Sequence, residues 1–135
     1  MRRRLGGRED GAAAVEFVLI SVLLVFLLFA VLQVAVFFYA RNIVSASAAD
    51  AARYAAAAGV STDAGGQRAR ILIAQGLGSA GASGIRCTSA SAIDPGTGLP
   101  IATVHCTGHV RALLAPIELP LRIDITTSAL RESTP

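Results

Sequence analysis

The sequence lacks several residues on which common biochemical functions depend. All twelve basic residues are arginine, so the chain has no lysine for a P-loop, a Schiff base or a kinase-type phosphate clamp. It has no tryptophan, two histidines and two cysteines, too few for a dense metal cluster or a disulfide-rich miniprotein. Charged residues make up 16% of the 135 residues, and hydrophobic residues make up 53%. With a mean hydropathy of +0.60, this composition predicts that part of the chain lies in lipid.

The net charge of +3 arises mainly at one end of the chain. Four of the twelve arginines lie within the first eight residues, namely Arg2, Arg3, Arg4 and Arg8. Removal of residues 1–11 would take away these four arginines and two acidic residues, and the remainder would carry a net charge of +1. The sequence has no basic stretch with interleaved aromatic residues, so the charge favours membrane orientation over binding of nucleic acid.

Residues 17–40 form a long run without a charged side chain, FVLISVLLVFLLFAVLQVAVFFYA. As a helix, this run would be about 36 Å long, enough to span the hydrocarbon core of a bilayer. Four arginines precede it, and only Arg41 and Arg53 follow soon after. The positive-inside rule therefore predicts a single-pass protein of the cytoplasmic (inner) membrane, with the N-terminus in the cytoplasm and the residues from about 42 onward extracytoplasmic.

A secretory signal peptide is an alternative interpretation of the same run. Its apolar core is usually about 7–15 residues long, and this run is clearly longer. The small residues at 45–49, SASAA, nevertheless resemble a signal-peptidase site. This alternative predicts a mature chain that starts near Asp50.

Directly before the apolar core, residues 11–17 read GAAAVEF. An ionisable residue at membrane depth is costly and points to a function, although Glu16 could also lie at the inner interface. Cleavage between Gly11 and Ala12 would create an ammonium group at Ala12, about one helical turn from the Glu16 carboxylate. The two charges could then neutralise each other, within one subunit or between subunits. A glycine before the cleaved bond also suits the extended backbone that a peptidase needs.

The arrangement of Gly11, Glu16 and Phe17 before an apolar helix resembles a class III (prepilin-type) signal. Together with AADAARYAAAAG at residues 48–59, it makes the chain similar to the TadE-like pseudopilin family of the tight-adherence (Tad, Flp-type) pilus system, over about residues 5–60. The resemblance implies cleavage after Gly11 by a membrane prepilin peptidase, with Glu16 and Phe17 as recognition and assembly residues. It also implies a minor, structural role in pilus biogenesis, with the lipid bilayer and other Tad pilins, pseudopilins and assembly proteins as partners.

Helical character should continue beyond the membrane. Residues 40–58 are rich in alanine, Gly59 is a suitable helix stop, and Asp50 and Arg53 are spaced to form an ion pair on the exposed side. After a turn in which Thr62 or Asp63 could cap a helix, residues 67–77 predict a short amphipathic helix. The composition of residues 76–84, GLGSAGASG, predicts a flexible linker.

After residue 84, hydrophobic residues recur at every second position, as in a β-strand. Residues 85–92 and 100–110 predict two strands around the turn at 94–98, DPGTG, and residues 119–130 predict a third. We expect a small antiparallel sheet packed on the soluble part of the long helix or on the short one. The predicted fold class is therefore membrane-anchored α+β: a long N-terminal transmembrane helix that extends into a stalk, a short helix, and about three strands.

Two cysteines lie within the predicted hairpin. The midpoint between Cys87 and Cys106 falls inside the turn at 94–98, so the hairpin would place them opposite each other, within reach of a disulfide. An extracytoplasmic location agrees with such a bond, which should contribute about 3 kcal/mol. Two unpaired buried thiols are the alternative.

The sequence predicts neither a metal site nor a catalytic site. In a strand, His105 and His109 would face away from Cys106, so these residues predict no metal site. The sequence contains neither H-E-x-x-H nor G-x-S-x-G, and we expect no enzyme activity, no cofactor and no small-molecule substrate.

The predicted organisation is a cytoplasmic prepilin-type leader (1–11), a transmembrane helix (12–40), a helical stalk (41–58), a turn with a short helix and linker (59–84), and a β-rich extracytoplasmic head (85–135). The alternative function is an unprocessed single-pass membrane anchor that presents a small extracytoplasmic binding module.

Overall fold

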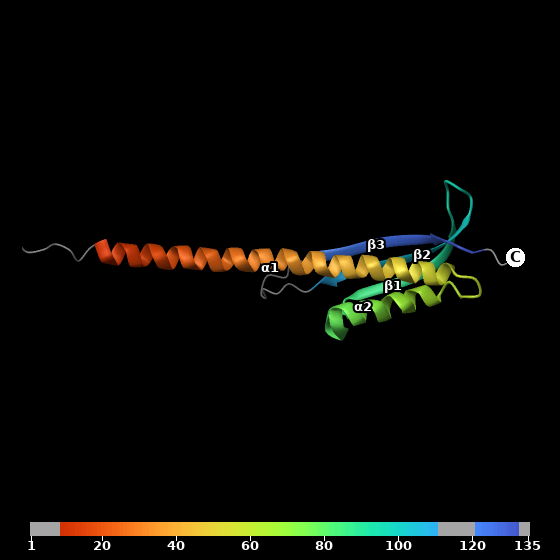
Figure 1. Cartoon of the computed structure of the whole chain (residues 1–135), viewed down its shortest axis with the longest axis horizontal. Helices are drawn as coiled ribbons and strands as arrows, with labels where there is room; N and C mark the ends of the chain where they lie inside the picture. The colour runs from red at the N-terminus through yellow and green to blue at the C-terminus, as the bar shows by residue number, and fades with distance from the viewer. Residues whose placement is uncertain (1–8, 111–120, 133–135) are drawn as a thin grey trace, which may run out of the picture. The chain divides into compact units, whose positions relative to one another are not determined.

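A computed structural model describes residues 9–110 and 121–132 of the chain. The four N-terminal arginines lie outside the described residues, as do residues 119 and 120 of the third predicted strand. Contacts divide the chain into two compact units, residues 1–35 and residues 36–135, which are described separately. The elements, labelled in Figure 1, are α1 (Glu9–Ala56), α2 (Ala64–Ala82), β1 (Ile85–Ile93), β2 (Pro100–Val110) and β3 (Leu121–Leu130).

The described part of the first unit is the N-terminal part of α1, which is apolar on all sides from residue 17 onward. Its large hydrophobic side chains are between 41% (Phe29) and 72% (Phe17) exposed. The one conspicuous hydroxyl is satisfied locally, because Ser21 donates a hydrogen bond to the carbonyl of Phe17 at 2.7 Å. α1 is long and apolar enough to cross a membrane, with a window of mean hydropathy 3.0 that is not buried in the protein. A helix of this kind requires an apolar environment, which confirms the membrane-anchored fold class.

The remainder of α1 belongs to the second unit and buries a narrow face of small residues. These residues recur every three or four positions, as one face of a helix requires: Ala40, Val44, Ala48, Ala51, Ala52 and Ala55. Ala40 is only 2% exposed, although the sequence placed it in the membrane segment. The boundary between the two units, at residue 35, therefore lies inside the predicted membrane segment (12–40). Residues 17–35 still form about 28 Å of helix, which matches a hydrocarbon core.

α2 is longer than the sequence predicted. It continues to Ala82, through the stretch where the composition of residues 76–84 indicated a linker, and it is interrupted only at Gly78 (φ 73°, ψ 164°). The glycines in this stretch serve packing as well as flexibility. A Cβ atom on Gly76 would lie 2.6 Å from the side chain of Ile43 in α1, so only glycine allows the two helices to approach this closely.

The three strands form the predicted antiparallel sheet, in the order β1-β2-β3. The β1–β2 turn is also as predicted. Asp94 accepts hydrogen bonds from the amide and the hydroxyl of Thr97, and Gly98 has the positive φ (69°) that the turn requires. The sequence located these strands well because hydrophobic alternation and turn residues both pointed to the same boundaries.

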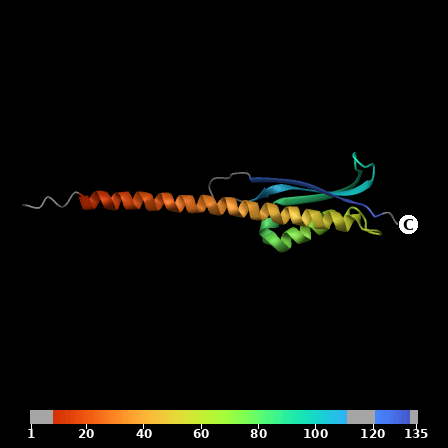
Figure 2. The ribbon, with the colours of Figure 1, turned by 45° about the horizontal axis from the view of Figure 1, so that its top comes forward.

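The sheet forms one layer of the second unit, and α2 and the second part of α1 form the other (Figure 2). One face of the sheet is therefore covered and the other is polar and exposed, as is usual for an antiparallel sheet. The residues of the covered face that share a cluster with Ala69 and Ile73 of α2 are Ile85, Cys87, Val104, Cys106 and Ile123. Ala102, on the same face, packs with Ala55 and Ala56 of α1.

Two isoleucines of α2 test this packing. Ile73 is 1% exposed and Ile71 is 46% exposed. We expect Ile73→Ala to lower the free energy of unfolding by about 2–4 kcal/mol, because it leaves a cavity in the core, and Ile71→Ala to lower it by less than about 1 kcal/mol. Pulse proteolysis in urea of the detergent-solubilised full chain measures both values. Equal effects of the two substitutions would contradict the described orientation of α2.

Candidate processing and assembly site

The predicted cleavage site lies inside a helix. α1 begins at Glu9, so the bond between Gly11 and Ala12 is in its first turn and not in the extended segment that we expected. A Cβ atom on Gly11 would meet nothing within 4 Å, so packing does not explain this glycine. The first amides of a helix have no intrahelical partners, and an internal glycine lowers helix stability by about 1 kcal/mol. Local unwinding of this turn is therefore the step that would expose the bond.

Glu16 and Phe17 follow on the same helix, and both are exposed. Ala12 and Glu16 are four residues apart, so the helix places them on one face, about 6 Å apart along its axis. A charge created at Ala12 would thus lie within reach of the Glu16 carboxylate. Phe17 is 72% exposed and faces the surroundings of the helix.

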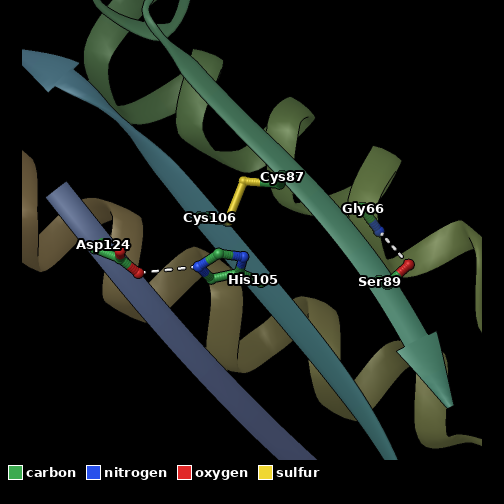
Figure 3. The surroundings of a disulfide bond; sticks show 6 residues. All are labelled: Gly66, Cys87, Ser89, His105, Cys106 and Asp124. Carbon is green, nitrogen blue, oxygen red and sulfur yellow. Dashed lines mark hydrogen bonds and ion pairs between the residues drawn. A yellow bond between two sulfur atoms is a disulfide. The ribbon is translucent and has the colours of Figure 1, made fainter.

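Cys87 and Cys106 form a disulfide, which confirms the predicted pairing and excludes two free thiols (Figure 3). They are directly opposite each other in the β1–β2 ladder, with their Cα atoms 4.1 Å apart. Three residues from the cysteines along the two strands, the amide of His109 donates a hydrogen bond to the carbonyl of Gly84. Because such bonds alternate along an antiparallel pair, the cysteines occupy a non-hydrogen-bonded position, where the strands approach most closely.

The disulfide faces the core of the second unit. Cys106 is fully buried and Cys87 is 8% exposed, and both belong to the cluster that contains α1 and α2 residues. The bond closes a sequence separation of 19 residues, which corresponds to about 3 kcal/mol of stabilisation in the chain-entropy model. For a small domain this is a large share of the total stability.

Ser89 joins the hairpin to α2, a role that the sequence analysis missed. Its hydroxyl accepts a hydrogen bond from the amide of Gly66 (2.9 Å) and donates one to the carbonyl of Thr62 (2.7 Å). It thereby satisfies an amide in the first turn of α2, whereas Asp63, at the N-cap, makes no side-chain capping bond. The available signal was a polar residue on the same face of β1 as Ile85 and Cys87.

Charged groups gather on the exposed face of the sheet. His105, which lies on the opposite face of β2 from Cys106, is 2.9 Å from Asp124, and Arg122 is 3.2 Å from the same carboxylate (Figure 3 for His105 and Asp124). The hydrogen bond with His105, followed by the charges of His105 and Arg122, lowers the pKa of Asp124 below its ordinary value of 3.8. Within the described ranges, His, Cys, Asp and Glu form no group of three or more that could hold a metal ion.

A further ion pair differs from the one that we predicted. Asp50 pairs with Arg68 of α2 at 3.3 Å instead of with Arg53 of its own helix. The Arg68 guanidinium also lies 5.7 Å from the centre of the Tyr54 ring. Tertiary packing of α2 on α1 brings Arg68 to this place, which spacing within one helix could not predict. Both partners are about half exposed, so the pair adds little stability.

The chain thus combines one exposed apolar N-terminal helix with a small α+β unit stapled by a disulfide. This is the class of membrane-anchored α+β proteins. Residues 11–53 match the model of the family described as TadE-like protein, which confirms the resemblance seen in the sequence. The match ends within α1, before α2 and the sheet. No curated protein and no solved structure matches the chain.

The contribution of the disulfide can be measured directly. Replacement of both cysteines, Cys87→Ser with Cys106→Ser, should lower the free energy of unfolding by about 3 kcal/mol, because the unfolded chain regains the freedom of the open loop. Pulse proteolysis of the full chain in detergent gives the value. Reduction should have the same effect on the wild-type chain and none on the double variant. A double variant as stable as the oxidised wild type would contradict the assigned role.

The Asp124 carboxyl should titrate below its ordinary pKa. Because its folded pKa is lowered, its contribution to stability is present above the ordinary value and is lost as the pH falls through the lowered pKa. We expect His105→Gln to raise the Asp124 pKa back toward 3.8. His109→Gln, on the same face of β2, should leave it unchanged. Carboxyl carbon NMR of the labelled chain reports the titration, and equal shifts in the two variants would contradict the assigned contact.

Proposed function

We propose that this protein is a minor pseudopilin that acts structurally in the biogenesis of a Tad (Flp-type) pilus and is processed by a prepilin peptidase after Gly11. The observation that carries the proposal is the position of GAAAVEF within the TadE-like match, at the start of an apolar helix with no cover of its own. Such a helix is an anchor in the membrane and a packing surface for other apolar helices.

Processing would change the chemistry of the N-terminus. Removal of residues 1–11 takes away four arginines, which hold the end of the chain at the cytoplasmic surface, and leaves a single ammonium group at Ala12. That group lies one turn from Glu16, so the two charges can pair in the same subunit or in a neighbour. A paired charge costs less in lipid than a lone one, which allows mature helices to shift register or leave the bilayer together.

Only the part of α1 that is not covered by α2 and the sheet is available for contacts with other subunits. Between Ala40 and Ala56, its small-residue face is occupied by α2 and the sheet of the same chain. The exposed apolar side chains up to residue 35 remain free to pack against pilin-like partners, where close contact between helices replaces contact with lipid.

The two ends of the chain support one orientation. The arginine-rich start favours the cytoplasmic side of the inner membrane, and the disulfide favours an oxidising extracytoplasmic compartment for the second unit. We therefore propose a leader at 1–11, a membrane helix at 12–40, a helical stalk at 41–58, and an extracytoplasmic head that contains the sheet (85–135). The head acts as a rigid structural part and has no catalytic role.

The mature N-terminus tests processing. Intact mass and N-terminal peptide sequencing of membrane-derived protein should give a start at Ala12, and the full-length start should return when the prepilin peptidase is absent. A chain that retains Met1 in the presence of the peptidase would support the unprocessed membrane anchor with a binding module. A start near Asp50 would support a secretory signal peptide.

Glu16→Ala tests the pairing of charges. We expect normal cleavage but at least about tenfold fewer pili, because an unpaired ammonium in lipid costs about 2.5 kcal/mol or more. Glu9→Ala is the matched control, since this acidic residue leaves with the leader and its loss should not affect piliation. Quantitative electron microscopy of the cells counts the pili. Normal piliation in Glu16→Ala would rule out the role given to this carboxylate.

A further inference from the structure

The second unit contains a cavity of about 620 Å³ that the proposed function does not use. It lies between α1, the C-terminal half of α2 and the end of β2, and its lining includes Val36, Ala40, Leu77, Ala80 and Val110. Its volume is within the range of sites that bind small molecules or single lipid chains.

The lining offers few polar groups to an occupant. The Tyr39 hydroxyl donates to the carbonyl of Gly76 at 3.2 Å, and the Ser83 hydroxyl donates to the carbonyl of Ala80 at 2.8 Å, so both donors are already used. The other lining side chains, except that of His109, are aliphatic or absent. The lining is therefore mainly apolar, which favours an apolar occupant.

The α1 part of the lining lies at the end of the uncharged run. Val36, Tyr39 and Ala40 directly precede Arg41, the first charged residue after that run. Phe38 and Tyr39 are more than half exposed, as is typical of aromatic residues at a membrane interface. The apolar surface of α1 therefore continues without a charged break into the wall of the cavity.

We propose that this cavity takes an acyl chain of a phospholipid from the extracytoplasmic leaflet. The proposal rests on the membrane anchoring in the proposed function, because it requires the end of the uncharged run to lie at the bilayer surface. Lipid is the most abundant apolar partner at that level, and the bound chain would fill space that the small residues Ala40, Gly76 and Ala80 leave empty. The head would then be held at the bilayer surface by lipid as well as by α1.

Photolabelling of the full chain tests this assignment. The processed protein is reconstituted in vesicles of phosphatidylethanolamine and phosphatidylglycerol that contain a phosphatidylethanolamine with a diazirine on one acyl chain. After illumination and trypsin digestion, we expect lipid adducts on peptide 12–41, from the membrane helix, and on peptide 71–86, which carries the α2 wall of the cavity.

Comparison of the two peptides distinguishes the membrane anchor from the lipid bound in the cavity. Adducts on 12–41 without adducts on 71–86 would overturn the lipid assignment and leave the membrane anchor intact. A cavity filled by another segment of this chain or by a second copy would give this same result. An absence of adducts on both peptides would contradict the anchor itself, and with it the lipid assignment.

Filling the cavity gives a second measurement. Ala80 is exposed to the cavity, and Ala80→Phe should reduce adducts on 71–86 about tenfold relative to those on 12–41, because each methylene of lipid that is displaced weakens binding about fourfold. Ala90→Phe, on the exposed face of β1, is the matched control and should leave the ratio unchanged. An unchanged ratio in Ala80→Phe, with its disulfide intact by mass, would overturn the assignment.

Discussion

Small residues allow α1, α2 and the sheet to approach one another closely, and the rest of the second unit depends on that contact. Gly65 lies at the point where the layers meet. A Cβ atom there would be 2.9 Å from Cβ of Ala55 and 3.2 Å from a methyl group of Val104. With larger residues the helices would move away from the sheet. The hydroxyl of Ser89 would then no longer reach the first turn of α2, and the disulfide would lose its cover.

The same constraint explains how α1 serves two environments. Up to residue 35 its large side chains are exposed on all sides, as a membrane helix requires, whereas from Ala40 onward it presents alanines to its own domain. The transition takes place within one unbroken helix. Bulky residues make contact with lipid, and small ones make contact with protein, so the side-chain volume along α1 marks where one environment gives way to the other.

The sequence predicted the elements that have local signals. The three strands, the turn at 94–98 and the pairing of Cys87 with Cys106 followed from alternation, turn residues and symmetry within a hairpin. It failed where tertiary contacts decide. Residues 76–84 appear flexible by composition, yet Gly76 is needed for the contact with Ile43. Likewise, Ser89 rather than Asp63 satisfies the start of α2, because the partner comes from a distant strand. For the proposed processing site, the residue types did not indicate that the bond between Gly11 and Ala12 lies in a helix.

The disulfide makes the stability of the second unit depend on the redox state of its compartment. A domain with this little core draws a substantial part of its stability from one covalent bond, and that bond does not form in a reducing cytoplasm. In the proposed orientation, the second unit would therefore be less stable until it reaches the oxidising side of the membrane. On that side, formation of the Cys87–Cys106 bond would complete the stability of the second unit.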